Sequence, residues 1–141
     1  MSKLAVVRIR SKVGMRETMF RTLKMLRLYR RNYCSVIENT PSTKGMVEKV
    51  KSFVTFGEIS DEFYAKLIEK KGEPFLGRTQ DSKGKIKYSF AEHAGKKYKP
   101  FFRLSPPRKG FGRKGIKTPF SQGGALGDRG EKISELIERM I

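Results

Sequence analysis

Two hydrophobic periods alternate along the first sixty residues. Short runs rich in β-branched and aromatic side chains predict strands, and runs in which apolar residues return every three or four positions predict helices. The predicted strands are residues 4–10, 33–37 and 53–57, and the predicted helices are residues 15–28 and 44–52. This order is typical of a small α+β fold, in which an antiparallel sheet carries one layer of helices on one face.

The ends of the elements carry local signals. Thr43 is a suitable N-cap for the second helix, and Ser60 is a suitable N-cap for a third helix at residues 60–71. Gly72 is well placed to end that third helix in the left-handed conformation. Further along, residues 85–90 alternate between polar and apolar side chains and predict a short strand.

The hydrophobic pattern breaks down in residues 96–130, which are rich in glycine and proline. Such a composition excludes a regular helix or a central strand and predicts an extended basic loop. Residues 131–140 are amphipathic, so we expect a terminal helix that docks on the body and leaves the loop held at both ends. We therefore divide the chain into a βαβαβ core at residues 1–58 and a C-terminal extension at residues 59–141.

The charge of the chain is concentrated in two blocks. Its 141 residues include 32 Lys and Arg against 14 Asp and Glu, which gives a net charge of +18. Residues 1–31 and residues 93–127 each carry a net +9, whereas the other 75 residues are balanced. A charge of this size indicates a polyanionic partner. Because it is concentrated, we expect two binding surfaces, or one surface built from two segments.

The basic side chains of these blocks are the candidate polyanion contacts. If the helix predicted at residues 15–28 extended to residue 31, four basic side chains would lie together on one face, namely Arg16, Lys24, Arg27 and Arg31. The candidates that rest on charge are Arg8, Lys12, Arg16, Lys24, Arg27 and Arg31 in the first block, Lys44 outside both blocks, and in the loop Arg103, Arg108, Lys109, Arg113, Lys114 and Lys117. Their ammonium groups and guanidinium forks suit phosphate oxygens.

Four phenylalanines are interleaved with the basic residues of the loop, namely Phe101, Phe102, Phe111 and Phe120. An exposed ring can stack on an unpaired base, whereas a buried ring anchors the loop to the body. We favour anchoring for Phe101 and Phe102, beside the apolar Leu104, and leave both roles open for Phe111. An irregular Gly/Pro-rich loop on a small α+β body favours folded RNA over DNA.

The sequence contains no constellation of catalytic or metal-binding residues. Cys34 lies in a predicted strand, where a buried structural thiol is expected, and His93 lies in a region of different character. Residues 110–115 match the G-x-G-x-x-G dinucleotide fingerprint, but neither a strand nor a helix flanks them. We therefore expect no enzyme activity, cofactor, metal or small-molecule substrate. We also expect no membrane span or secretory signal, and the lone cysteine fits a reducing cytosol.

Two separated groups of residues resemble a known family. The first is Arg10-Ser11, Gly14, Thr22-Leu23, Leu26, Leu28, Arg30, Asn32, Glu38, Thr40-Pro41, Gly45-Met46-Val47 and Lys49-Val50. The second is Phe53-Val54, Phe56-Gly57-Glu58, Leu104, Pro106-Pro107-Arg108, Gly110, Gly115, Lys117, Pro119, Gly123-Gly124 and Leu126-Gly127. Together they resemble the large-subunit ribosomal protein family numbered thirty in bacteria and seven in eukaryotes. The chain is similar to its longer form and, without a long basic N-terminal extension, to the archaeal version.

This resemblance implies a ferredoxin-like core and a structural, non-catalytic role in the large subunit of the cytoplasmic ribosome. It implies binding to large-subunit rRNA in ribosome assembly and translation, with 5S rRNA and other large-subunit proteins as neighbours. The candidates carried over by position are Arg10, Arg30, Gly45 and Lys49 in the core, and Arg108, Gly110 and Lys117 in the loop. Two rival functions stay open at this point, a DNA-binding architectural protein and a small RNA-modifying enzyme.

Overall fold

A central five-stranded sheet organises the fold. The computed structural model describes residues 3–75, 82–84, 91–93, 95–111 and 113–141. The strands follow the order β6-β2-β1-β3-β7 across the sheet. They are β1 (Lys3–Arg8), β2 (Tyr33–Glu38), β3 (Val54–Ile59), β6 (Phe102–Arg103) and β7 (Gly127–Asp128). A separate hairpin is formed by β4 (Ala91–His93) and β5 (Lys96–Tyr98).

Strand β1 lies in the middle of the sheet and is antiparallel to both neighbours. Ala5 is opposite Val36 of β2 on one side and Gly57 of β3 on the other. The three predicted core strands are thereby confirmed. The antiparallel sheet predicted for the core is likewise confirmed, and the extension adds β7, which runs parallel to β3. Both edge strands come from residues 96–130, and each is only two residues long, as the proline and glycine content of that segment allows.

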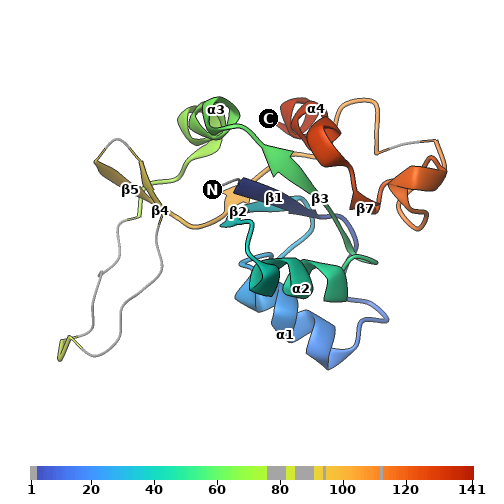
Figure 1. Ribbon diagram of the computed structural model, residues 1–141, viewed down its shortest axis with the longest axis horizontal. Helices are drawn as coiled ribbons and strands as arrows, with labels where there is room; N and C mark the ends of the chain where they lie inside the picture. Colours follow the sequence, from blue (N-terminus) through green and yellow to red (C-terminus); the bar gives the residue numbers. More distant parts are fainter. Residues whose placement is uncertain (1–2, 76–81, 85–90, 94, 112) are drawn as a thin grey trace.

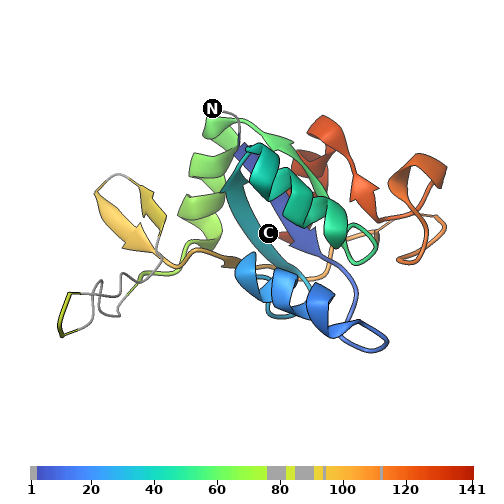
Figure 2. The ribbon, with the colours of Figure 1, turned by 60° about the horizontal axis from the view of Figure 1, so that its bottom comes forward.

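Two pairs of helices cover opposite faces of the sheet (Figure 1). The pair on one face is α1 (Glu17–Met25) and α2 (Pro41–Lys49), which lie side by side (Figure 2), and the other pair is α3 (Asp61–Lys71) and α4 (Ile133–Met140). Leu4 and Val6 of β1 belong to the first apolar core, and Ala5 and Val7 belong to the second. The single helix layer that was predicted is therefore correct for residues 1–58, and the extension adds a layer on the other face.

Helix α1 is shorter than predicted. It ends at Met25, and the backbone N–H of Leu28 donates to the carbonyl oxygen of Leu23 at 2.9 Å. Arg27 has a φ of 66°, in the left-handed region, so the chain leaves the helix at this point. The prediction of a helix over residues 15–28 is therefore too long at both ends.

Helix α2 begins earlier than predicted, at a capping box. Thr40 Oγ1 accepts a hydrogen bond from the backbone N–H of Thr43 at 3.3 Å, and Thr43 Oγ1 accepts one from the N–H of Thr40 at 3.0 Å. Pro41 fills the first helical position, where its missing N–H costs nothing. The prediction of Thr43 as the N-cap is therefore wrong, because Thr43 lies inside the first turn.

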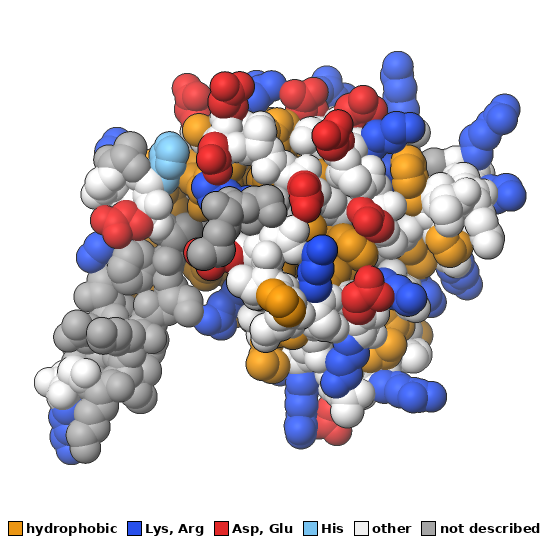
Figure 3. Space-filling view, viewed as in Figure 1, with side chains coloured by type: hydrophobic (Ala, Val, Ile, Leu, Met, Phe, Trp, Pro, Cys, Tyr) orange, Lys and Arg blue, Asp and Glu red, His pale blue; other side chains and the backbone are white. Residues whose placement is uncertain are grey.

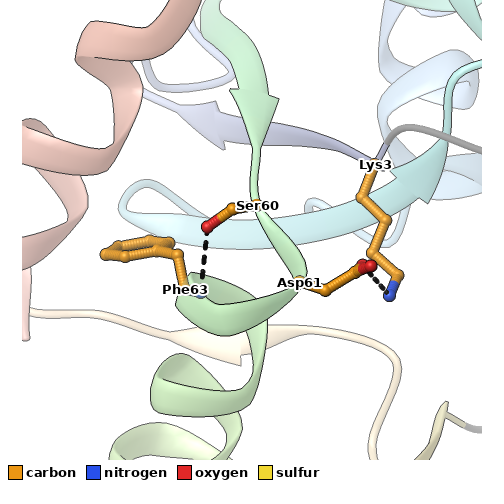
Figure 4. A network of polar contacts seen from close by, with 4 residues as sticks. All are labelled: Lys3, Ser60, Asp61 and Phe63. Carbon is orange, nitrogen blue, oxygen red and sulfur yellow. Dashed lines mark hydrogen bonds and ion pairs between the residues drawn. The ribbon is translucent and has the colours of Figure 1, made fainter.

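At α3 the predicted N-cap is confirmed. Ser60 Oγ accepts a hydrogen bond from the backbone N–H of Phe63 at 3.2 Å (Figure 4). Beside it, the Lys3 ammonium donates to Asp61 at 2.8 Å, which ties the start of β1 to the first turn of the helix. The pKa of Asp61 is lowered, first by this hydrogen bond and then by the Lys3 charge. The second helix layer is thus joined to the sheet by a polar contact.

Helix α3 does not end on a left-handed glycine. Gly72 has a φ of −62°, so that prediction is wrong. A Cβ at this position would lie 2.4 Å from the carbonyl oxygen of Ile68 and 3.0 Å from the ring of Tyr98, so glycine is needed here for close packing. The strand predicted at residues 85–90 lies outside the described residues.

The terminal helix docks on the body as predicted. A 3₁₀ turn, η2 (Gly130–Lys132), leads into α4, whose fully buried side chains are Ile133, Leu136, Ile137 and Met140. They pack in the core that also contains Ala5 and Val7. The loop that precedes the helix is therefore anchored at its C-terminal end by a large apolar contact.

Candidate nucleic-acid interface

Basic side chains from the first charge block surround α1. We call this region, residues 10–31, the N-terminal basic surface; its exposed candidates are Lys12, Arg16, Lys24, Arg30 and Arg31. The ammonium groups of Lys12 and Lys24 lie 4.8 and 4.6 Å from the centre of the Phe20 ring. The partly exposed Arg10 guanidinium lies 4.8 Å from the centre of the Phe53 ring. Contacts of this kind hold a cation in place without neutralising it.

Arg8 does not belong to this exposed surface. The residue is only 2% exposed, and its Nη1 donates to the carbonyl oxygen of Leu28 at 3.0 Å. Its Nε donates to the carbonyl oxygen of Arg10 at 3.1 Å. The prediction of Arg8 as a surface contact is therefore wrong. The physical reason is that β1 is the central strand and is covered on both faces.

The basic residues around α1 also do not share one helical face. Arg16 is the N-cap of α1 and Lys24 lies in its last turn, whereas Arg27 and Arg31 follow the helix in the loop to β2. The prediction that Arg16, Lys24, Arg27 and Arg31 share one helical face is therefore wrong for Arg27 and Arg31. Arg31 is still exposed, and Arg27 is half-buried. The N-terminal basic surface is built from a helix and from the loop on either side of it.

Helix α2 adds three candidates beside α1. They are Lys44, Gly45 and Lys49, and all three are exposed. A Cβ built on Gly45 would meet nothing within 4 Å. The fold itself therefore does not require a glycine at this helical position, where alanine would be more stable. A bare backbone here leaves room for the close approach of a partner.

Five of the nine basic residues of the second charge block lie in a loop between β6 and β7. We call residues 104–126 the C-terminal basic loop; its exposed candidates are Arg108, Lys109, Gly110, Arg113, Lys114 and Lys117. None of these basic side chains forms an ion pair within the part of the chain that the structure describes. Figure 3 shows Lys and Arg side chains projecting at the end of the molecule that carries this loop, and acidic side chains over α3 and α4. The positive charge of the loop is thus not neutralised locally.

Two arginines that were not predicted as polyanion contacts attach the C-terminal basic loop to the body of the protein. Arg129 follows β7 and is 7% exposed; its Nη2 donates to the carbonyl oxygens of Phe111 at 3.0 Å and Ala125 at 3.2 Å. Arg139 of α4 donates from Nη1 to the carbonyl oxygens of Gly110 at 3.0 Å and Arg108 at 3.3 Å. Counting charges along the sequence does not distinguish such arginines from exposed ones.

An apolar contact brings the two basic segments together. Ile9, directly after β1, forms a small buried cluster with Ala125 and Leu126 of the loop. Phe111 and Ile116, from the middle of the loop, pack against the same cluster. The N-terminal basic surface begins one residue after Ile9. The two charge blocks therefore adjoin, as expected for one surface built from two segments.

Phenylalanines in the C-terminal basic loop and just before it anchor the loop to the body. Phe102 is buried in the core, and the half-buried Phe101 stacks on Tyr33 with ring centres 5.4 Å apart. Anchoring is therefore confirmed for both. Phe111, for which both roles were open, packs partly buried against two apolar clusters. Affinity for a polyanion at this loop must therefore come mainly from its charges rather than from stacking on these rings.

Arg103 makes a different contact from the other candidates. It lies on β6, and its Nε donates to Glu73 at 2.5 Å, while the Lys99 ammonium lies 3.1 Å from the same carboxylate. Burial raises the pKa of Glu73, but the hydrogen bonds from Arg103 and Lys99 outweigh it and hold the pKa below its ordinary value. Arg103 thus has an acidic partner, which sets it apart from the basic candidates of the loop.

We expect this carboxylate to give the fold a pH-dependent contribution. The lowered pKa of Glu73 means that its contribution is present above the ordinary value of 4.5 and is lost as the pH falls through the lower folded value. Glu73→Gln should reduce the free energy of unfolding at pH 7 by less than about 1 kcal/mol, because the contact is partly exposed. Urea titrations at pH 7 and pH 3 measure this. A deficit of equal size at both pH values would contradict it.

Cys34 and His93 do not offer a catalytic pair. Cys34 is fully buried, and burial raises the pKa of its thiol to about 12, so the thiolate is not formed near neutral pH. The His93 ring packs edge-on near the Tyr64 ring, with centres 6.2 Å apart. Among the described residues there is no cluster of three or more His, Cys, Asp or Glu that could hold a metal ion. The helices described there are also too short or too polar to cross a membrane.

The sheet with helices on both faces and the two adjoining basic segments define a small α+β protein suited to binding a polyanion. The family described as Ribosomal protein L30p/L7e matches residues 4–54, from β1 to the start of β3. The chain is 43% identical to the large ribosomal subunit protein uL30 of Nanoarchaeum equitans, over the whole of both chains. It is 42% identical to the protein of that name from Methanopyrus kandleri, over 94% of this chain and all of the relative. The chain therefore belongs to the L30p/L7e family of ribosomal proteins.

A third relative has the same name and comes from another archaeon. The protein from Methanococcus maripaludis is 43% identical over 97% of this chain and 98% of its own length. The matches thus include the C-terminal extension as well as the core. They confirm the resemblance to the longer, archaeal form of the family.

Proposed function

We propose that this protein is a structural component of the large ribosomal subunit that binds large-subunit rRNA through the N-terminal basic surface and the C-terminal basic loop. Family membership supports the ribosomal role, which is structural rather than catalytic. The observation that carries the binding surface is that the five exposed cations of the C-terminal basic loop form no ion pair within the described residues. Such a surface keeps its full attraction for phosphate.

The mechanism is phosphate neutralisation combined with shape. The candidate contacts are Arg10, Lys12, Arg16, Lys24, Arg27, Arg30, Arg31, Lys44, Gly45 and Lys49, with Arg108, Lys109, Gly110, Arg113, Lys114 and Lys117 in the loop. Arg8 and Arg103 are left out, because the first is buried and the second is paired with Glu73. An array of cations at fixed positions on two segments matches a folded RNA, whose phosphates converge from different strands.

The finer part of the proposal concerns neighbours in the subunit. We place 5S rRNA and other large-subunit proteins close to this protein during assembly and translation in the cytoplasm. The support for this is the resemblance of the core and loop motifs to the family. The first test is co-sedimentation of the native protein with large subunits through a moderate salt wash. A 5S rRNA arm in the binding assay below tests that contact separately.

Competition binding tests the choice of polyanion. Labelled protein is titrated with large-subunit rRNA fragments, with 5S rRNA and with duplex DNA of equal length at one salt concentration, because affinities at different salt cannot be compared. We expect at least one rRNA fragment to bind more than about tenfold more tightly than the duplex. Equal or tighter binding of the duplex would instead support a DNA architectural protein.

A further inference from the structure

Two buried arginines share an unusual environment. Arg8 and Arg129 are 2% and 7% exposed, and neither forms an ion pair with a carboxylate in the described part of the chain. A buried cation normally requires an acid or several hydrogen bonds to offset its loss of water. Burial accordingly lowers the pKa of both guanidinium groups, with a smaller effect from Arg31 on Arg8 and from Arg139 on Arg129. Each of the two basic segments thus has one such arginine beneath it.

Arg8 joins the two ends of the N-terminal basic surface. Its Nε bonds the carbonyl oxygen of Arg10, before α1, and its Nη1 bonds the carbonyl oxygen of Leu28, after α1. The backbone N–H of Asn32 in turn donates to the carbonyl oxygen of Arg8 at 2.8 Å. The loops on both sides of α1 are therefore fixed to the end of the central strand by one residue.

Arg129 does the same for the C-terminal basic loop. Its Nη2 bonds the carbonyl oxygens of Phe111 and Ala125, which are fourteen residues apart in the sequence. Its Nε donates to Thr55 Oγ1 of β3 at 2.9 Å, and its guanidinium lies 4.7 Å from the centre of the Phe120 ring. One side chain therefore connects three parts of the loop region to the sheet.

We propose that Arg8 and Arg129 are positioning residues, which hold the two basic segments in their RNA-binding form before RNA arrives and do not touch the RNA themselves. This inference rests on the proposed function. Carbonyl partners are the reason that arginine suits the task, since they satisfy its donors and leave the positive charge in place. A carboxylate partner would order the loop equally well but would reduce its attraction for phosphate.

The rest of the fold shows the contrast. Cations near α3 and the hairpin are paired with acids, as in Lys3–Asp61, Lys66–Glu138 and the two contacts of Glu73. In those places ordering and neutralisation occur together. Arg21 and Glu17 form one such pair on the exposed side of α1, but at Arg8 and Arg129 the structure achieves ordering without an acid. A segment that is ordered in advance loses less conformational entropy when it binds, and this strengthens its affinity.

Lysine substitution separates positioning from charge. Arg129→Lys and Arg8→Lys keep the net charge, but an ammonium group cannot reproduce a planar fork that reaches several acceptors at once. We expect each variant to bind the best rRNA fragment about tenfold more weakly, with an unchanged slope of log affinity against log salt. In the free variant, amides of the segment concerned should exchange faster with solvent, and the bound variant should regain wild-type protection. The matched control is Arg103→Lys, which lies outside the proposed contacts and can still pair with Glu73; the affinity of this variant should change less than about twofold.

The possible results are distinct. Failure of the wild-type protein to bind any rRNA fragment overturns the proposed function. If the wild type binds and both lysine variants bind equally well, the positioning role is overturned. A loss of affinity with a smaller salt slope would also overturn it, because it indicates a lost phosphate contact.

If Arg129→Lys is not folded at the assay temperature, Thr55→Val replaces it in the test. That change removes the acceptor of Arg129 Nε at similar volume, and it also removes the 2.9 Å hydrogen bond from Thr55 Oγ1 to the carbonyl oxygen of Gly127. We expect faster exchange of loop amides and weaker binding, again with the wild-type salt slope. Wild-type affinity in a folded Thr55→Val protein would then overturn the positioning role of Arg129.

Discussion

Replacing Arg108, Lys109, Arg113 and Lys114 together with glutamine is expected to weaken binding to the best rRNA fragment by about a hundredfold or more near physiological salt. All four side chains are exposed, and none has an acidic partner within the described residues. Each phosphate contact releases counterions, so losing four of them should lower the slope of log affinity against log salt by about three. Filter binding over a series of salt concentrations measures both quantities.

A control with the same chemistry isolates the position of the charges. Lys66 and Lys70 are exposed on α3 and Lys71 is half-buried there, outside both basic segments. Changing these three to glutamine should lower affinity only slightly and leave the salt slope near its wild-type value. A slope that is unchanged in the loop variant would count against the loop as a phosphate contact. A slope that falls equally in both variants would mean that only the total charge matters.

The location of the basic segments could be predicted from the sequence, because charge blocks remain visible whatever the fold. Whether a particular basic side chain is buried or exposed could not be predicted by counting charges. Arg8 is the one polar residue in the run from Leu4 to Ile9. A nearly continuous apolar run without alternation is typical of a strand buried on both faces, and this signal indicates a buried Arg8. For Arg129 the sequence carries no comparable signal, since its partners are 4, 18 and 74 residues away.

The helix ends show the same division between local and distant causes. Thr40 followed by Pro41 is a helix-start signal, and with it the N-terminus of α2 could have been placed correctly from the sequence. Gly72 follows lysines at the end of a helix, and locally it favours a left-handed stop. Its extended conformation depends on Tyr98, which packs close to it from a hairpin some 26 residues further along. The conformation of Gly72 is therefore decided by tertiary packing and not by the local sequence.

Gly57→Ala is expected to have the largest effect on stability, lowering the free energy of unfolding by about 3 kcal/mol. Sequence pattern alone suggests a glycine that closes the third strand, whereas the structure places Gly57 inside β3, opposite Ala5. A Cβ there would lie 2.1 Å from the carbonyl oxygen of Gly130 and 2.8 Å from Cγ2 of Ile133. Because one obstacle is backbone, relief requires the η2 turn and α4 to move away from the sheet.

Urea unfolding of the full chain measures the effect, and Gly45→Ala is the matched control. Gly45 lies in α2 with open space around a built Cβ, so alanine there should raise stability by about 0.5–1 kcal/mol. The same substitution should therefore have opposite signs at two glycines. In Gly57→Ala, displacement of η2 should also loosen Arg129, the residue just before it, and speed exchange of the loop amides. Wild-type stability of Gly57→Ala would show that the extension does not depend on this close approach to the sheet.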